Sequence, residues 1–283
     1  MLAELQALFA ATEQAGLTLD GIFIDNFIST STIDLCPAHL AAADLPLTYD
    51  PNTYRPGVHT ASAGWEFLTA LRALLDDQPD PYRTISINFW ALNIPTQLAP
   101  YIDAFGGEGA ATQGDNWTPE ILDYRMATAL GRPRLFANQQ SDLTIEQIET
   151  FVHEALFYGI RPSRGPNAAN WPTGYEALLE WGQDQVKAFI PLGWQPIPLA
   201  HTDHSDVWVE RFGNEVFTVH NWGDAPTDFT LTIDLDALGL EAANLQITES
   251  VSGESITAGT SGDGSLQISA HLEPGRTAVY WLQ

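Results

Sequence analysis

The sequence predicts an α/β fold built on a parallel sheet, followed by a smaller domain of antiparallel strands. Two observations carry this prediction. In the first two thirds of the chain, short apolar runs alternate with amphipathic segments of about 10–15 residues, which is typical of βαβ units. From about residue 200, segments with alternating apolar and polar residues follow one another between turns, as in antiparallel sheets. We therefore expect two domains, 1–198 and 199–283.

The first part of the chain alternates between helices and strands. Residues 2–15 carry apolar side chains at helical spacing, and Gly16 follows as a natural stop. The run GIFIDNF at 21–27 is expected to be a strand buried on both faces, as in most parallel sheets. A helix over 62–75 with Ser62 as its N-cap then leads to a strand at 84–90. The remaining segments are expected to be helical at 92–99, 120–131 and 145–159 and to be strands at 101–105, 133–138 and 159–163.

The last part of the chain contains six strand-like segments and turn sequences such as GDGS and EPGR. Alternation within the segments indicates one face toward a core and one face toward solvent. Together they predict an antiparallel β-sandwich. The expected strands cover 206–212, 215–222, 228–235, 245–251, 265–272 and 277–282.

The composition limits the partners of the chain. Its 36 acidic and 11 basic residues give a formal net charge of −25, while 45% hydrophobic residues indicate a folded chain. Such a charge repels phosphate backbones and anionic lipids, so we expect no nucleic-acid partner and no membrane insertion. The amino terminus lacks the features of a signal peptide, and the cellular location stays open.

No metal and no cofactor are expected. Cys36 is the single cysteine, which excludes an intrachain disulfide and a cysteine-built metal site. The densest group of histidine and aspartate residues, at 201–206, fits a polar turn better than a metal site. The sequence contains neither the dinucleotide-binding glycine fingerprint nor a P-loop, and the Ser/Thr-rich segment 29–32 has no histidine at a recognisable spacing.

Polar residues gather where the expected parallel strands end. Ligands of such sheets bind at the carboxyl ends of the strands, because the loops that follow the strands converge there. Amide and guanidinium groups can bond sugar hydroxyls, an indole can stack on a sugar ring, and paired carboxylates can cleave a glycosidic bond. We therefore expect a carbohydrate substrate. The candidate catalytic residues are Asp25 and Glu108, and the candidate substrate-binding residues are Asn26, Asn88, Trp90, Asp103, Asn138, Gln139, Arg161 and Arg164.

Asp25 and Glu108 are the two carboxylates that we favour. Three apolar residues place Asp25 at the end of its strand, although an aspartate that caps the next loop would also stand there. Glu108 follows two glycines that let the backbone approach a ligand, although GGEG is also an ordinary turn. Asp103 lies within or at the end of its strand. For four other candidates, the sequence is compatible with both substrate contact and a structural role. They are Asn88, Trp90, Asn138 and Arg161.

Several segments together resemble barrel glycosidases of the α-galactosidase-like and related superfamilies. DGIFIDNF at 20–27 resembles their fourth-strand motif, in which the strand ends in the catalytic aspartate. The resemblance extends over nearly the whole chain through SAGWEFLTAL, DAFGGEG, LDYRMATALGRPRLFANQ, YGIRPS, GWQPIPLAHTDHSDVWVERFGNEVFTVHN and LEPGRTAVYWL. It implies strands four to eight of a (β/α)8 TIM barrel, followed by the β-sandwich that these enzymes often carry.

The resemblance also implies a mechanism without a cofactor. Asp25 would be the nucleophile at the end of strand four, and Glu108 would be the acid/base after strand six. Asp25 would attack the anomeric carbon while Glu108 protonates the leaving oxygen and then activates water. Enzymes that retain configuration in this way hold the two carboxyl groups about 5–5.5 Å apart.

The first three barrel strands of the resemblance have no counterpart in the sequence. A five-stranded parallel sheet would keep two open edges and an uncovered interior. We therefore expect an N-terminal truncation, a misplaced start codon or an assembly, with the missing N-terminal barrel half supplied upstream or by another chain. Two other functions stay open: a carbohydrate-binding protein that hydrolyses nothing, and a structural module whose sandwich mediates contacts.

Overall fold

The computed structural model describes residues 2–25, 32–44, 47–77, 83–88, 96–111, 117–252, 256, 258–260 and 264–283. The chain forms two compact units, Met1–Gly107 and Glu108–Gln283. The expected domain boundary between residues 198 and 199 stays a prediction, and the second unit spans it. None of the helices in the described ranges is long and apolar enough to cross a membrane.

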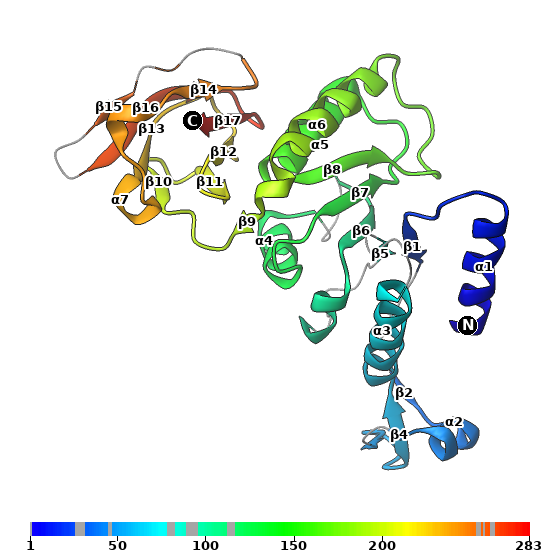
Figure 1. Cartoon of the computed structure of the whole chain (residues 1–283). Helices are drawn as coiled ribbons and strands as arrows, with labels where there is room; N and C mark the ends of the chain where they lie inside the picture. Colours follow the sequence, from blue (N-terminus) through cyan, green and yellow to red (C-terminus); the bar gives the residue numbers. More distant parts are fainter. Residues whose placement is uncertain are drawn as a thin grey trace. The chain divides into compact units, whose positions relative to one another are not determined.

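A parallel sheet of five strands forms the α/β part of the fold, as the sequence predicts (Figure 1). Its strands follow the chain in the order β1-β5-β6-β7-β8, which is expected of successive βα units. They are β1 (Gly21–Ile24), β5 (Thr84–Asn88), β6 (Ala104–Gly109), β7 (Arg134–Asn138) and β8 (Ile160–Arg164). The helices of this part are α1 (Leu2–Gln14), α3 (Thr60–Asp76), η1 (Thr96–Tyr101), α4 (Pro119–Thr128), α5 (Ile145–Phe157), α6 (Tyr175–Phe189) and η2 (Ile190–Leu192).

Strand β1 is less buried than the sequence predicts. The expectation that both of its faces are covered is wrong, because Phe23 is 60% exposed. Its position explains the difference: β1 lies at an edge of the described sheet, with β5 as its neighbour. Gly21 allows these two strands to approach closely, since a Cβ at that position would lie 2.2 Å from the carbonyl oxygen of Thr84.

A small antiparallel sheet lies between β1 and α3, in a stretch for which the sequence predicts no regular element. Its order is β2-β4-β3, and β4 leads directly into α3 (Figure 1). His59 caps α3 in place of the expected Ser62, because its Nδ1 accepts a hydrogen bond from the backbone N–H of Ala61 at 3.2 Å. The elements of this insertion are β2 (Ile33–Asp34), α2 (Pro37–Ala42), β3 (Thr48–Tyr49) and β4 (Pro56–His59).

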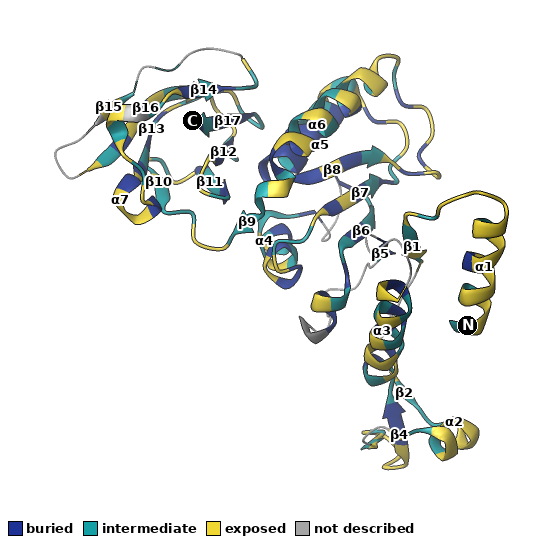
Figure 2. Ribbon diagram, in the orientation of Figure 1, coloured by how far each residue is buried: buried dark blue, intermediate teal, exposed yellow. Residues whose placement is uncertain are grey.

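Helix α1 has the predicted extent but buries little of its apolar face. Phe9 is its buried side chain, and most of the helix is exposed (Figure 2). Helix α3 is packed better, since its buried residues recur at spacings of three and four and so form one continuous stripe. They are Ala61, Gly64, Leu68, Leu71 and Leu75.

Helices α5 and α6 pack against each other and against β8 in the second unit (Figure 1). A capping box begins α5, because Thr144 and Gln147 each accept a hydrogen bond from the other's backbone N–H. Helix α6 was not among the expected elements, although its buried residues Leu179, Gly182 and Val186 have helical spacing. Gly182 lets the two helices approach closely, since a Cβ there would lie 2.4 Å from Cγ1 of Val152.

The last part of the chain forms the predicted antiparallel sandwich of two sheets. One sheet has the order β10-β13-β16-β15 and the other has the order β14-β17-β12-β11-β9. Two of the expected strands, 265–272 and 277–282, have the predicted bounds. The elements are β9 (Trp194–Gln195), β10 (Ala200–Thr202), β11 (Val207–Phe212), β12 (Val216–Asn221), β13 (Thr227–Asp234), α7 (Leu235–Leu238), η3 (Ala242–Asn244), β14 (Ile247–Glu249), β15 (Gly259–Thr260), β16 (Ser265–Leu272) and β17 (Thr277–Leu282).

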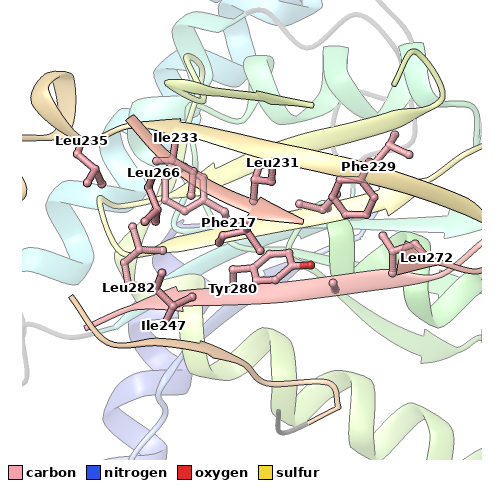
Figure 3. Close-up of a cluster of buried hydrophobic side chains, with 14 of the residues drawn as sticks. Phe217, Phe229, Leu231, Ile233, Leu235, Ile247, Leu266, Leu272, Tyr280 and Leu282 are labelled. Atoms are coloured by element: carbon pink, nitrogen blue, oxygen red, sulfur yellow. The ribbon is translucent and has the colours of Figure 1, made fainter. Parts of the chain in front are cut away.

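A continuous apolar core lies between the two sheets of the sandwich. Phe217 and Tyr280 come from one sheet and Phe229 and Leu231 from the other, and all four side chains point into the same layer (Figure 3). Burial of such side chains contributes roughly 1.5–3 kcal/mol each relative to exposure.

The second face of the β17-β12 sheet is covered by helices. Every residue of β12 is buried, because Phe217 and Val219 face the sandwich core while Val216 packs with residues of α5 and α6. The hydroxyl of Thr218 on β12 donates to the carbonyl oxygen of Phe157 at the end of α5, at 2.7 Å. The sandwich and α5 therefore share one packed interface.

Candidate functional site

Asp25 and Asn88 form a pair at the carboxyl end of the first two parallel strands. Ile24 of β1 lies opposite Ile87 of β5, so the next residue of each strand is also adjacent. Asn88 Nδ2 donates to Asp25 Oδ1 at 2.9 Å. Asp25 is exposed at this strand end. A neutral amide donor can orient the carboxylate without adding a positive charge beside it.

Glu108 forms a similar pair with Gln139 in the second unit. Glu108 is the penultimate residue of β6, and it does not lie in a glycine turn beyond the strand. Gln139 follows β7, and its Nε2 donates to Glu108 Oε2 at 2.8 Å. The backbone N–H of Gln139 also donates to the carbonyl oxygen of Gly109 at 2.7 Å. The ends of β6 and β7 therefore position this carboxylate and its amide partner.

The loop after β8 fixes the side chain of Gln139. Its Oε1 accepts a hydrogen bond from the backbone N–H of Asn167 at 3.1 Å. Gly165 lies directly against the amide, since a Cβ there would lie 2.4 Å from Oε1 of Gln139. With Oε1 committed to this loop, the NH2 group of Gln139 is directed at Glu108. The amide is thus held in one orientation by contacts on both of its atoms.

Asp103 does not lie where the sequence prediction placed it. Strand β6 begins at Ala104, so Asp103 stands at the amino end of this strand and not within it or at its carboxyl end. Its Oδ2 accepts a hydrogen bond from the backbone N–H of Ile85 at 2.8 Å and forms an ion pair with Arg72. These contacts give Asp103 a structural role at the edge opposite the expected substrate site, and the prediction of its position is wrong.

Arg161 and Arg164 lie on β8 and contact the segments around α6. Arg161 is the second residue of β8, and its Nη2 donates to Oε1 of Gln183 on α6 at 3.2 Å. Arg164 ends the strand, and its Nε donates to the carbonyl oxygen of Ala168 at 3.1 Å while Nη1 donates to the hydroxyl of Tyr175 at 2.9 Å. Arg161 therefore lies away from the carboxyl end of its strand, and Arg164 shapes the loop that supports Gln139.

Of the three remaining candidate substrate-binding residues, one lies in a turn and two lie outside the described residues. Asn138 ends β7 and is fully buried, and its Oδ1 accepts a hydrogen bond from the backbone N–H of Gln140 at 3.0 Å. This contact is an Asx turn, which places the following residue, Gln139. Asn26 and Trp90 lie outside the described residues.

Within the polar segment at 201–206, residues 203–206 form the expected turn, while His201 and Thr202 belong to β10. Asp203 Oδ1 accepts a hydrogen bond from the backbone N–H of Thr230 at 2.7 Å, and His204 Nδ1 accepts one from that of Asp206 at 3.3 Å. Across the described parts of the chain, no three His, Cys, Asp or Glu side chains are grouped so that they could hold a metal ion.

The sequence analysis missed two partly buried carboxyl groups. Trp117 Nε1 donates to Glu154 on α5 and Trp194 Nε1 donates to Glu210 on β11, each at 2.6 Å. Burial raises the pKa of each of these glutamates to about 7. Perturbed groups of this kind can mark functional sites, but here Glu154 links α5 to the segment before α4, and Glu210 links β11 to β9, away from the carboxyl ends of the parallel strands. The pairing of each glutamate with a tryptophan is not visible as a sequence pattern.

A chain of hydrogen bonds joins two buried histidines at the interface between α5 and the sandwich. The backbone N–H of Thr277 donates to His153 Nδ1 at 3.2 Å, and its hydroxyl donates to the carbonyl oxygen of His153 at 2.6 Å. That hydroxyl therefore accepts from His220 Nδ1, which lies 2.8 Å away. Burial lowers the pKa of His153 to about 4 and that of His220 to about 3, so both are neutral near pH 7.

No protein-family model matches the chain, and no curated protein matches it in sequence. Among solved structures, α-galactosidase I from Mortierella vinacea is 11% identical, with a TM-score of 0.49 over 79% of this chain and 64% of the enzyme. The α-fucosidase of Thermotoga maritima is 15% identical, with a TM-score of 0.33 over 98% of this chain and 67% of the enzyme. A β-porphyranase of glycoside hydrolase family 86 from Bacteroides plebeius is 11% identical, with a TM-score of 0.33 over 79% of this chain and 52% of the enzyme. The chain spans half to two thirds of these enzymes, and its fold is distantly similar to those of glycoside hydrolases.

Proposed function

We propose that the chain carries the catalytic carboxylates of a retaining glycoside hydrolase that acts on a neutral oligo- or polysaccharide. Asp25 is the nucleophile and Glu108 is the acid/base. One observation supports this proposal above the others: each carboxylate stands at the carboxyl end of a parallel strand and accepts a hydrogen bond from a side-chain amide at the carboxyl end of the next parallel strand in sequence.

The amide partners suit the two chemical roles. A nucleophile must keep its negative charge and reach the anomeric carbon, and Asp25 is exposed and oriented by the neutral amide of Asn88. An acid/base must exchange a proton with the leaving group and with water. The amide of Gln139 bonds Oε2 of Glu108, so the proton can be carried by Oε1.

The mechanism proceeds in two steps. Asp25 attacks the anomeric carbon, the glycosidic C–O bond breaks, and the proton of Glu108 moves to the leaving oxygen. Glu108, now a carboxylate, takes a proton from water as that water attacks the glycosyl ester of Asp25. The ester bond breaks, the sugar leaves with its original anomeric configuration, and both carboxyl groups return to their starting states.

The experiment that tests this proposal compares carboxylate variants on a panel of aryl α- and β-glycosides. Asp25→Asn and Glu108→Gln should each lower kcat/KM by about 10²–10⁴-fold, the range expected for loss of such a group. Asp20→Asn, just before β1, and Glu180→Gln, on α6, make the same chemical changes at exposed positions and should leave the rate unchanged.

Azide then assigns the two roles. With Asp25→Ala, azide attacks the substrate directly and gives a glycosyl azide of inverted configuration. With Glu108→Ala, azide attacks the covalent intermediate and gives a product of retained configuration. Equal activity of the parent and both carboxylate variants, or a parent that hydrolyses none of the glycosides, would contradict the proposal. Glycan binding without hydrolysis would then favour a carbohydrate-binding protein.

A further inference from the structure

The β3–β4 hairpin (residues 47–59) lies in the loop that connects β1 to α3, and it follows the candidate nucleophile in the chain. Strand β3 pairs with β4, with Tyr49 opposite Pro56. The hairpin lies beyond the amino end of α3 (Figure 1). Loops after the strands of a parallel sheet usually carry its binding residues. The hairpin therefore occupies a segment where substrate contacts are expected.

This hairpin exposes an unusual set of apolar side chains. Leu47 is 52% exposed, Tyr49 65% and Tyr54 79%, and Pro56 is exposed as well. Leu47 comes just before β3, and Tyr49 on β3 has Pro56 as its cross-strand neighbour. Exposed apolar residues are ordinary when single, but this group is clustered and includes two aromatic rings.

The turn of the hairpin is held rigidly. Asp50 Oδ1 accepts hydrogen bonds from the backbone N–H groups of Asn52 (2.7 Å) and Thr53 (3.1 Å). The backbone N–H of Tyr54 donates to the carbonyl oxygen of Asp50 at 2.8 Å, and that of Asp50 donates to the carbonyl oxygen of Arg55 at 2.9 Å. A ring presented by such a turn loses little conformational freedom when it binds a ligand.

Tyr54 is strained in this turn. Its φ of 55° lies in the left-handed region, where a Cβ crowds the backbone and glycine is the favoured residue. A turn that only reversed the chain would be more stable with glycine at this position. The strained, 79% exposed tyrosine thus points to a task for its ring.

We propose that Tyr49 and Tyr54 form a platform that binds a neutral polysaccharide through stacking on its sugar rings. The phenol rings match the apolar faces of pyranoses, and their hydroxyl groups can bond sugar hydroxyls. The net charge of −25 opposes acidic polysaccharides and other polyanions. The identity of this ligand rests on the proposed function, and the platform extends it by assigning a polymeric substrate.

The test is affinity electrophoresis of the full chain in native gels that contain galactomannan, xylan or laminarin, with polygalacturonate as an acidic comparison. At least one neutral polysaccharide should retard the parent. Tyr49→Ala and Tyr54→Gly should each weaken this binding by about tenfold, the effect of losing one ring contact. Tyr54→Phe should bind within about twofold of the parent, because it keeps the ring. Tyr124→Ala, at a 45% exposed tyrosine on α4, should bind like the parent.

Thermal unfolding separates lost binding from lost folding. Tyr54→Gly relieves the left-handed strain, so its unfolding midpoint should equal or exceed that of the parent even though its binding is weaker. A parent that no neutral polysaccharide retards, retardation by polygalacturonate alone, or tyrosine variants that bind like the parent would overturn the platform.

The same set of variants distinguishes failure of the platform from failure of the proposed function. Asp25→Asn should bind polysaccharide like the parent, and the tyrosine variants should hydrolyse short aryl glycosides like the parent. Hydrolysis that needs Asp25, combined with unchanged binding in both tyrosine variants, overturns only the platform. Binding that needs the tyrosines, combined with hydrolysis indifferent to Asp25, overturns only the proposed function.

Discussion

The two compact units differ in how completely they cover their apolar side chains. The first unit holds 107 of the 283 residues, yet it contains seven of the eleven large apolar side chains that are strongly exposed among the described residues. In the second unit, β12 is buried on both faces and β17 is buried at five of its six positions. The seven in the first unit are Leu8, Leu17, Phe23, Leu47, Tyr49, Tyr54 and Trp65.

The difference depends on whether a second layer of structure covers both faces of a strand. The second unit contains a sandwich sheet that lies against α5, so β12 and β17 have a partner layer on both sides. Strand β1 of the first unit lies at a sheet edge and leaves Phe23 exposed. The expectation that the missing N-terminal barrel half is supplied upstream or by another chain stays a prediction.

The largest expected effect contrasts one phenylalanine from each unit. Phe217→Ala removes a fully buried ring from the sandwich core and should lower the free energy of unfolding by about 3–5 kcal/mol. Phe23→Ala makes the same change at a 60% exposed position and should cost about 0.5 kcal/mol or less. Urea unfolding of both variants measures the contrast. Equal losses would show that Phe23 is covered in solution.

Acid should weaken the interface between α5 and the sandwich. Burial lowers the pKa of His220 from the ordinary value of 6.5 to about 3, so the unfolded chain binds more protons than the folded chain between these pH values. The stability contributed by neutral His220 is therefore complete above about pH 6.5 and is lost as the pH falls toward 3, by about 2–4 kcal/mol. His220→Asn keeps a donor for Thr277 but cannot be protonated. The free energy of unfolding of this variant should depend less on pH between about 3 and 6.5 than that of the parent. If the variant and the parent show the same dependence on pH, His220 is not its cause.

Glu154, which accepts a hydrogen bond from Trp117 before α4, should make the stability depend on pH in the opposite direction. Burial raises its pKa from the ordinary value of 4.5 to about 7, so the folded chain binds more protons than the unfolded chain between these pH values. Its stabilising contribution is complete below about pH 4.5 and is lost as the pH rises through 7. Glu154→Gln keeps an acceptor for Trp117. The change in the free energy of unfolding that this substitution causes should be about 1–3 kcal/mol more favourable at pH 8 than at pH 4. Equal effects at pH 4 and pH 8 would contradict this assignment.

Gln139 provides a smaller effect, on catalysis. Gln139→Ala removes the amide that orients Glu108 and should lower kcat by about tenfold with little change in KM, the cost of one hydrogen bond to a charged group. Gly165→Ala should give the same fall in kcat, since its Cβ would displace Oε1 of Gln139. An unchanged kcat in both variants would leave Gln139 with a structural role only.

The sequence could predict the sandwich well because each strand carries its own signal. The alternation in 265–272 and 277–282 is long enough to fix both bounds. The insertion before α3 gives no comparable signal, because its strands are two to four residues long and are stabilised by pairing across turns. Helix α6 was predictable from the spacing of Leu179, Gly182 and Val186, and we missed that pattern.

The candidate site could be predicted residue by residue but not as contacts. The sequence placed Asp25 and Asn88 near strand ends, within the expected strands 21–27 and 84–90. The structure has β1 at Gly21–Ile24 and β5 at Thr84–Asn88. The start of β6 could not be located, because AFGGEG contains three glycines and has no alternating pattern, and Asp103 was placed wrongly as a result. The support of Gln139 by Asn167 and Gly165 depends on the path of the loop after β8, which no local pattern encodes.

The most direct test of the proposed function is covalent trapping of the nucleophile. The chain would be incubated with activated fluoroglycosides of galactose, fucose and glucose, whose fluorine slows hydrolysis of the glycosyl ester. Intact mass and peptide mapping would then locate the label. The account predicts one sugar on the peptide that contains Asp25, and no label in Asp25→Asn. A label on another carboxylate, or no label with any of the three sugars, would contradict the assignment of Asp25 as the nucleophile.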